Sequence, residues 1–365
     1  MKRSFIREIL ENTTDKTISF AGGLPNIDTF PQSLIEEVAN KILQNREVLQ
    51  YSNSWGDNDL REEIAKRYTK NGFKTKANNI LITSGSQQAL DIVCRYYANL
   101  SIIIEKPSYL GALNLFKLNK ITTNPIKLLN NGIDIKALKR GIIKDKLLYL
   151  IPDFQNPTAI RYSLKKRKEI AKLIKEKSAI LIEDSPYSEL YFNKATPSIS
   201  SFAPKNSILL GSFSKVLAPS LRVGYIRADK KILESLIAYK EAMDLHTSTI
   251  TQKIVAELLK QELKYNKNLQ KTREYYQKKC NYFSKVLDKE LPQFNYQKPK
   301  GGMFIYGKIS GINSTKLLEK TMQKGVVFVP GSEFAGEADE IRFNFTNSTK
   351  KDIKKGIKII ASLLK

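Results

Sequence analysis

The chain has 365 residues, with 61 lysines and arginines against 36 aspartates and glutamates, which gives a formal net charge of +25. Its length predicts two domains, its hydrophobic fraction of 41% excludes a disordered protein, and no apolar run is long enough to cross a membrane. The lysines are spread along the whole chain without a recognition helix, so we expect a basic surface that attracts small anions and no nucleic-acid partner.

The first two thirds of the chain alternate short apolar runs with helix-length segments. Six runs are rich in Ile, Leu and Val, as buried strands are, at residues 79–83, 101–105, 147–151, 179–183, 207–210 and 223–226. Residues 87–98 and 164–176 between them have the length and polarity of helices. This alternation predicts an α/β fold with a largely parallel sheet that helices cover on both faces.

The pattern changes after residue 230. Residues 231–288 are charged and helical in character, and three strand-like runs follow at 303–309, 325–329 and 340–346. The last segment predicts a helix with one apolar face, formed by Ile353, Ile357, Ile360 and Leu364. These elements predict a second, smaller α+β domain.

Polar residues follow the predicted strands, at the sheet edge where ligands bind in such folds. After residues 207–210 come Ser212, Ser214 and Lys215, with Arg222 seven residues later. A lysine placed after a buried strand can be desolvated and form an imine with a carbonyl cofactor, while hydroxyls and an arginine suit a phosphate. The ordinary alternative is a solvated lysine.

Two further strand ends could serve the same ligand. Ser86 and Gln87 begin a helix whose free N–H groups favour an anion, although a plain helix cap has the same sequence. Asp184 ends an apolar strand, where a carboxylate needs a partner such as a pyridinium N–H. A helix cap or an ion pair is the alternative there.

Seven blocks occur in order over nearly the whole chain: ISFAGGLP at 18–25, LQY at 49–51, SGSQQAL at 84–90, QNPT at 155–158, EDSPY at 183–187, SFSKVLAPSLRVGY at 212–225 and IRFNF at 341–345. Together they resemble the class I and II pyridoxal-phosphate (PLP) aminotransferases. The resemblance is greatest to the branch with 2-aminoadipate and kynurenine aminotransferases and the aminotransferase domain of MocR-type regulators. It implies the PLP-dependent transferase fold (fold type I), with a mainly parallel seven-stranded sheet between helices and a smaller α+β domain.

The resemblance also implies a division of the chain and a role for each site residue. We expect an N-terminal segment packed with the small domain (1–45), a large PLP-binding domain (46–240), and an interdomain helix with the small C-terminal domain (241–365). Lys215 would form the internal aldimine and move the substrate proton, and Asp184 would pair with the pyridinium nitrogen. Asn156 and Tyr187 would bind the phenolic oxygen of the ring, and Tyr109 would stack on its face.

The remaining residues would bind the charged groups of cofactor and substrate. The phosphate would be held by Ser86, Gln87, Ser212, Ser214 and Arg222. Arg342 would bind the substrate α-carboxylate as a two-pronged pair, with Asn156 and Gly23 beside it. Tyr51 would reach the phosphate of a neighbouring subunit, which implies a homodimer.

We therefore expect an aminotransferase that acts between an L-amino acid and a 2-oxo acid, with glutamate and 2-oxoglutarate as one pair. A C–S β-lyase or a decarboxylase on the same scaffold is the alternative. A PLP-sensing regulator is less favoured, because only 17 residues precede Ile18. A single histidine and two distant cysteines, Cys94 and Cys280, argue against a metal site and favour the reducing cytoplasm.

Two features leave the substrate open. Arg3 or Arg7 could reach a carboxylate on the substrate side chain, although ordinary surface arginines would look the same. Ala159 and Ser220 stand where the family usually has glycine, so the backbone of two active-site loops could be displaced.

Overall fold

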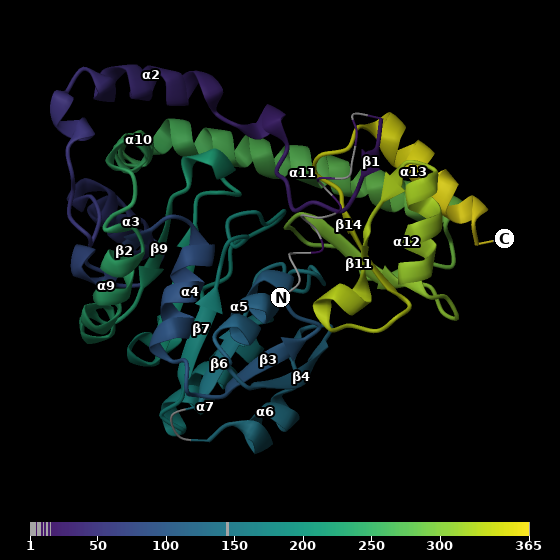
Figure 1. Ribbon diagram of the computed structural model, residues 1–365, viewed down its shortest axis with the longest axis horizontal. Coiled ribbons are helices and arrows are strands. Elements are labelled where there is room, and N and C mark those ends of the chain that lie inside the picture. Colours follow the sequence, from purple (N-terminus) through teal and green to yellow (C-terminus); the bar gives the residue numbers. More distant parts are fainter. Residues whose placement is uncertain are drawn as a thin grey trace.

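The computed structural model describes residues 5, 9, 11, 14, 16–143 and 146–364. Its main feature is an eight-stranded sheet with the strand order β2-β9-β8-β7-β6-β3-β4-β5 (Figure 1). The strands are β2 (Ile80–Thr83), β3 (Ile102–Lys106), β4 (Thr123–Leu129), β5 (Gly132–Ile133), β6 (Leu147–Leu150), β7 (Ile180–Asp184), β8 (Ser207–Ser212) and β9 (Gly224–Arg227). Strands β8, β7, β6, β3 and β4 are parallel, and β9 is antiparallel to both of its neighbours.

The six strands predicted for this sheet are all present, and β4 and β5 are additional. Strand β4 escaped prediction because Asn124, Pro125 and Lys127 give it the polarity of a loop, which an outer strand tolerates. The two residues of β5 turn back on β4 in antiparallel pairing, so the sheet has eight strands where seven were expected.

Alternate residues of the central strands face opposite sides of the sheet, and both sides are buried. Ile104 and Tyr149 pack in one apolar cluster with Leu90 of helix α4 (Ser86–Tyr96). Ile103 and Leu148 pack in a second cluster with α7 (Leu164–Glu176). Each such fully buried aliphatic side chain contributes about 1.5–3 kcal/mol. Because both faces of the sheet are buried, the sequences of these strands are continuously apolar.

The C-terminal part contains two small sheets. One is antiparallel, with the order β10 (Asn295–Tyr296), β11 (Phe304–Lys308), β14 (Glu340–Asn344) and β13 (Val329–Pro330). The other pairs β1 (Ile18–Ser19) with β12 (Val326–Val327). The run at 325–329 was expected to be one strand, but it divides at Phe328 because its two halves pair with different partners. Helix α13 (Lys350–Ser362) buries Ile353, Ile357 and Ile360, as its apolar face predicts.

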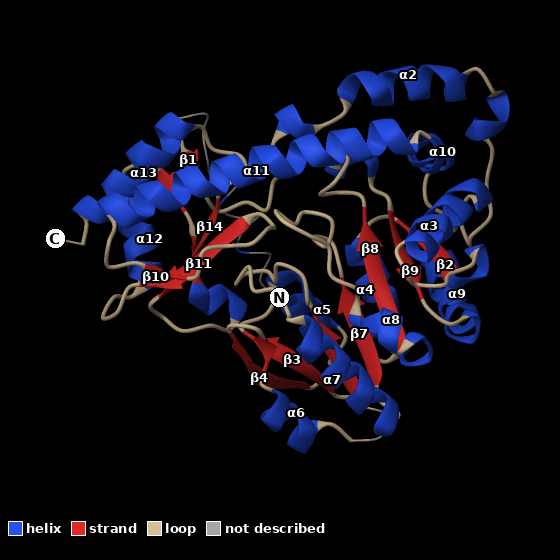
Figure 2. Cartoon of the chain, turned by 180° about the vertical axis from the view of Figure 1, so that it is seen from behind, coloured by secondary structure: helices blue, strands red, loops and turns tan. Residues whose placement is uncertain are grey.

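Long helices connect the two parts of the molecule. The charged segment after residue 230 forms α9 (Lys230–Asp244), α10 (Thr249–Lys260) and α11 (Glu262–Glu290), and α11 extends from α10 to the small sheets (Figure 2). Helix α2 (Gln32–Leu43) packs against α10, whereas β1 belongs to a small sheet. Residues 1–45 thus include elements in both parts, and the division at residues 45 and 240 stays a prediction.

The other described helices are α3 (Asn58–Lys70), α5 (Leu110–Leu118), α6 (Ile135–Gly141), α8 (Ile199–Phe202), α12 (Ser314–Gln323), and the short 3₁₀ turns η1 (Ile27–Thr29), η2 (Arg46–Leu49), η3 (Ala77–Asn79), η4 (Pro204–Asn206), η5 (Pro219–Leu221) and η6 (Gly331–Phe334). Within the described part of the chain, no helix has an apolar stretch of the length needed to span a bilayer.

Candidate active site

A cavity of about 760 Å³ opens at the carboxyl ends of the central strands, where the sequence predicted a binding site. It brings together all but one of the predicted site residues, namely Gly23, Ser86, Gln87, Tyr109, Asn156, Asp184, Tyr187, Ser212, Ser214, Lys215, Arg222 and Arg342. These residues come from both parts of the chain, so the cavity forms only when the small sheets lie against the large one.

Lys215 reaches the cavity from the loop after β8. Its Nζ donates a 2.8 Å hydrogen bond to the carbonyl oxygen of Gly23. Burial lowers the pKa of Lys215 to about 8, and the positive charges of Arg222 and Arg342 act in the same direction. A lysine with a lowered pKa is more often neutral near pH 7 and is a better nucleophile and base.

Asp184 lies at the end of β7 and is buried. Its Oδ2 accepts a 2.7 Å hydrogen bond from the hydroxyl of Tyr149, while its buried Oδ1 has no partner among the described residues. Burial raises the pKa of Asp184 to about 7, although the bonds from Tyr149 and the Ser185 backbone oppose the rise. A buried oxygen without a partner fits an absent donor, and the protonated ring nitrogen of PLP is such a donor.

A group of donors suited to a phosphate lies at the first turn of α4. Gly85 caps this helix with φ +95° and provides no side chain, so the N–H groups of the first turn stay available to a ligand. Arg222 packs beside Gly85 and donates from Nη2 to the carbonyl of Ser84 at 2.8 Å. The hydroxyl of Ser212 accepts from the backbone N–H of Ser214 at 3.2 Å. These charges and dipoles would favour a dianion.

Arg342 is buried and also lines the cavity. Its Nη1 donates to Oδ1 of Asn156 at 2.7 Å and its Nη2 donates to the carbonyl of Ala21. Its Nε has no partner within the described part of the chain. Burial lowers the pKa of Arg342 to about 10, and no carboxylate of the described residues pairs with it. An arginine in this state suits a carboxylate that arrives with the substrate.

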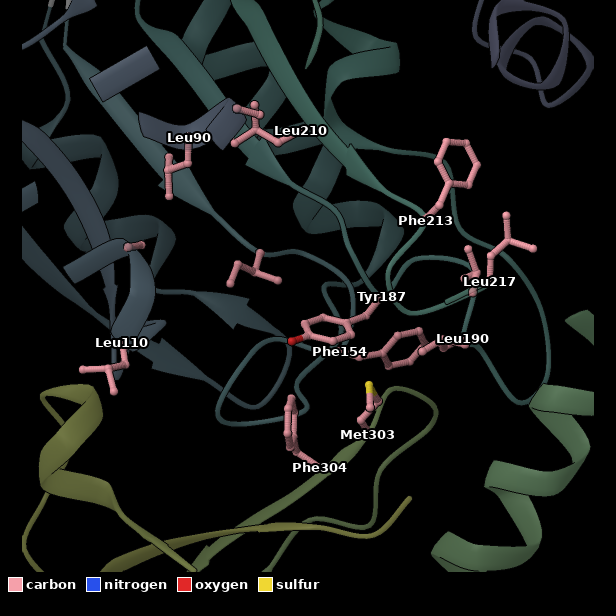
Figure 3. Close-up of a cluster of buried hydrophobic side chains, with 14 of the residues drawn as sticks. Leu90, Leu110, Phe154, Tyr187, Leu190, Leu210, Phe213, Leu217, Met303 and Phe304 are labelled. Carbon is pink, nitrogen blue, oxygen red and sulfur yellow. The ribbon is translucent and has the colours of Figure 1, made fainter. Parts of the chain in front are cut away.

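Apolar side chains at the cavity connect the large and small sheets. The ring of Tyr187 meets the ring of Phe304 edge to face at 5.8 Å, and Figure 3 shows both beside Phe154 and Met303. The guanidinium of Arg342 lies 4.3 Å from the centre of the Phe304 ring. Phe304 belongs to β11 and Tyr187 to the loop after β7, so this contact joins the small and large sheets.

Three sequence expectations have different outcomes in the structure. Tyr51 does not line the cavity and is 80% exposed. Ala159 has a positive φ of +57°, a conformation that favours glycine, whereas Ser220 lies in η5 and has no positive φ. Arg3 and Arg7 lie outside the described residues.

Sequence reasoning missed Tyr149, the donor to Asp184. It lies within β6, and its only signal was a single hydroxyl in an otherwise aliphatic strand. The described residues contain no group of three His, Cys, Asp or Glu side chains that could hold a metal ion.

Comparison with known proteins gives concordant results. A family model described as "Aminotransferase class I and II" matches residues 18–360. The 2-aminoadipate transaminase of Thermus thermophilus is 35% identical, with 100% of this chain and 94% of that protein covered. The aromatic-amino-acid aminotransferase 1 of Thermococcus litoralis is 34% identical, with 100% and 92% covered.

A solved structure gives the same result. The alpha-aminoadipate aminotransferase of Thermus thermophilus, complexed with N-(5'-phosphopyridoxyl)-L-leucine, superposes with a TM-score of 0.92 at 34% identity. The match covers 100% of this chain and 95% of that one. The predicted fold type is therefore confirmed.

Proposed function

Since the chain belongs to the class I and II aminotransferases and is a PLP-dependent enzyme of that family, we propose that glutamate and 2-oxoglutarate are one of its substrate pairs. The cavity holds three cationic side chains, Lys215, Arg222 and Arg342, against the single carboxylate of Asp184. With Arg222 assigned to the cofactor phosphate and Lys215 to the cofactor carbonyl, Arg342 is left for the α-carboxylate of an amino acid. The choice of glutamate is supported by the name of a relative, 2-aminoadipate transaminase, which denotes a dicarboxylic amino acid.

One observation carries the proposal, namely two unsatisfied buried atoms on residues that line the same cavity. Asp184 Oδ1 lacks a donor and Arg342 Nε lacks an acceptor. A PLP ring and an amino-acid carboxylate would satisfy them together, and Lys215 lines the same cavity. Bound PLP supplies an aldehyde carbon that accepts the amino group and a ring that stabilises the electrons released at the substrate α-carbon.

In this proposal Lys215 attaches the cofactor through Nζ and acts as the general base and acid. Because its pKa is lowered to about 8, Nζ could take the proton from the substrate α-carbon as a base and later donate it as an acid to the former aldehyde carbon. Arg342 orients the α-carboxylate so that the bond to be broken faces Nζ. Asp184 stays ionised beside a protonated ring nitrogen, which strengthens the ring as an electron acceptor.

Other residues would set the position of the ring. Asn156 donates from Nδ2 to the hydroxyl of Tyr187 at 3.4 Å, and we assign both to the phenolic oxygen of the cofactor. Tyr109 donates to Oε1 of Gln87 at 3.2 Å, and we assign its ring to the open face of the pyridine. The phosphate would bind Ser86, Gln87, Ser212, Ser214 and Arg222, and Gly23 would line the substrate side.

We also propose that the enzyme is a homodimer in the cytoplasm. Tyr51 and Leu49 are two residues apart in the chain and are 80% and 70% exposed, and exposed apolar patches mark interaction surfaces. In a dimer Tyr51 would contribute its hydroxyl to the phosphate site of the partner. Cys94 and Cys280 are both free and buried, as is common in a reducing compartment.

The substrate assignment is tested by incubating the PLP-loaded enzyme with glutamate and a panel of 2-oxo acids and measuring 2-oxoglutarate. We expect its formation with at least one acceptor, and none with Lys215→Ala. Turnover of other amino donors without any reaction of glutamate would refute the substrate pair and leave the enzyme class intact.

A further inference from the structure

A strained turn follows helix α9, between two residues whose side chains reach different segments of the candidate site. Leu245 has φ +59° and ψ −58°, and the N–H of His246 donates to the carbonyl of Asp244 at 2.6 Å. This is a γ-turn with a positive φ, which is rare and strained for a residue with a Cβ. Such a conformation persists only where surrounding contacts hold it, and here Asp244 and His246 supply those contacts.

Asp244 holds the loop and first turn that begin α4. Its Oδ2 accepts hydrogen bonds from the hydroxyl of Ser84 at 2.9 Å and from Nε2 of Gln88 at 2.8 Å. Gln88 in turn accepts from the backbone N–H of Ser84 at 2.7 Å, and the carbonyl of Ser84 accepts from Arg222. One carboxylate therefore fixes both ends of the segment that carries Gly85, Ser86 and Gln87.

The charge of Asp244 is balanced before any anion binds. Burial tends to raise the pKa of Asp244, but hydrogen bonds from Lys240, Gln88 and Ser84 outweigh this and keep it below its ordinary value. The side chain of Lys240 is fully buried and pairs with Oδ1. Asp244 can thus orient the phosphate-binding loop without placing a net negative charge behind it.

His246 holds the segment next to Tyr51. Its Nε2 accepts a 3.2 Å hydrogen bond from the backbone N–H of Ser52. Its Nδ1 lies 2.9 Å from the carbonyl of Thr247, so Nδ1 must carry the proton. The imidazole ring also meets the Tyr51 ring edge to face, at 5.8 Å and 90°. The backbone beside an exposed tyrosine is therefore fixed by the same turn.

We propose that Asp244 and His246 are positioning residues for the cofactor phosphate. Asp244 orients the α4 loop and Arg222 within its own subunit, and His246 orients Tyr51 toward the phosphate of the partner subunit. This inference rests on the proposed function, including the homodimer. It adds that the turn at Leu245 contacts two segments. One is the phosphate site of its own subunit, and the other carries Tyr51, which would serve the phosphate site of the partner subunit.

The first test compares two cofactors that differ only in the phosphate. Dissociation constants of PLP and pyridoxal are measured on cofactor-free wild type, Asp244→Ala and the control Glu241→Ala, an exposed carboxylate on the same helix. We expect Asp244→Ala to weaken PLP about tenfold or more and to leave pyridoxal within about twofold. Ser84→Ala, which leaves the Lys240 pair intact, should give a smaller loss of the same kind and serves if Asp244→Ala does not fold.

The second test concerns His246 and Tyr51. The amide of His246→Gln can reach the Nε2 position, whereas that of His246→Asn reaches only the Nδ1 position. We expect His246→Gln to bind PLP with nearly the wild-type dissociation constant. His246→Asn should have the same weakened dissociation constant for PLP as Tyr51→Phe. The double variant of His246→Asn with Tyr51→Phe should be no weaker than Tyr51→Phe alone, because one residue acts through the other.

The contrary results are distinct. Equal losses for PLP and pyridoxal, no loss in Asp244→Ala, or additive losses in the double variant would each overturn the positioning roles. If the wild type itself binds PLP no more tightly than pyridoxal, the proposed phosphate site is wrong, and not only the positioning roles of Asp244 and His246.

Discussion

Nη1 of Arg342 donates a 2.7 Å hydrogen bond to Oδ1 of Asn156, which lies 186 residues earlier in the chain. The same amide directs its Nδ2 to the hydroxyl of Tyr187. The group that would bind the substrate carboxylate is therefore joined through one asparagine to the group that would bind the cofactor ring. Both are in place before a ligand binds, which is the arrangement that catalysis by positioning requires.

Arg342→Lys should raise the KM for glutamate by about 10-fold to 150-fold with a smaller change in kcat. A lysine keeps the charge but loses the planar pair of donors, and one bond to a charged group contributes roughly 1.5–3 kcal/mol. Steady-state kinetics measure this, with Arg95→Lys, an exposed arginine outside the cavity, as the control. An unchanged KM would show that Arg342 does not bind the carboxylate.

Asp184→Asn should lower turnover by about 100-fold or more and weaken PLP binding. The amide has the size of the carboxylate but cannot stabilise a protonated ring nitrogen, so the ring accepts electrons less well. Tyr149→Phe, which removes only the donor to Oδ2, should have a much smaller effect. Stopped-flow traces of the reaction with glutamate separate the chemical step from binding. Wild-type turnover in Asp184→Asn would place the ring elsewhere.

Glu105 should make the cofactor-free protein less stable as the pH rises. Burial raises the pKa of Glu105 to about 8, although bonds from Tyr162, Gln155 and the Ile151 backbone oppose it. The folded state then holds a proton that the unfolded state releases, so this contribution is complete below about pH 4.5 and lost toward pH 8. The slope is at most about 1.4 kcal/mol per pH unit.

Glu105→Gln removes this titration and keeps the size of the side chain. Denaturant unfolding at several pH values should therefore show a shallower fall between pH 5 and 8 in the variant than in the wild type. The raised pKa of Asp184 acts in the same direction in both proteins, so the difference between the two slopes reports Glu105. Equal slopes would mean that Glu105 is ionised throughout.

Gly224→Ala should weaken PLP binding by at least about tenfold. A Cβ at Gly224 would lie 2.6 Å from the carbonyl carbon of Gly85 and 2.8 Å from the backbone nitrogen of Ser86, so the first turn of α4 must move. Gly141→Ala is a matched control, because its Cβ would come no closer than 3.8 Å to its nearest neighbour. Fluorescence titration of both variants with PLP measures the two affinities. Equal affinities for PLP would contradict a role for the close approach of Gly224 to the first turn of α4.

The sequence predicted the central strands and most of the cavity because both follow from local pattern. A buried strand followed by a polar turn places Lys215 and Asp184 at one sheet edge whatever the rest of the chain does. Tyr149 and the division of 325–329 depend on tertiary contacts, with a carboxylate on the next strand and with two separate sheets. Local pattern does not encode such contacts. The role proposed for Tyr51 would depend on a second subunit, which the pattern of one chain does not describe.

In the proposed function, Lys215 carries PLP and glutamate converts the bound cofactor to its amine form. The most direct measurement is the absorbance spectrum of the PLP-loaded protein before and after addition of glutamate, and again after a 2-oxo acid. We expect the wild type to have a visible absorbance band that Lys215→Ala lacks. Glutamate should replace the visible band with a near-ultraviolet band, and 2-oxoglutarate should restore the visible band. A wild-type spectrum without the visible band, or a band of equal strength in Lys215→Ala, would contradict the account.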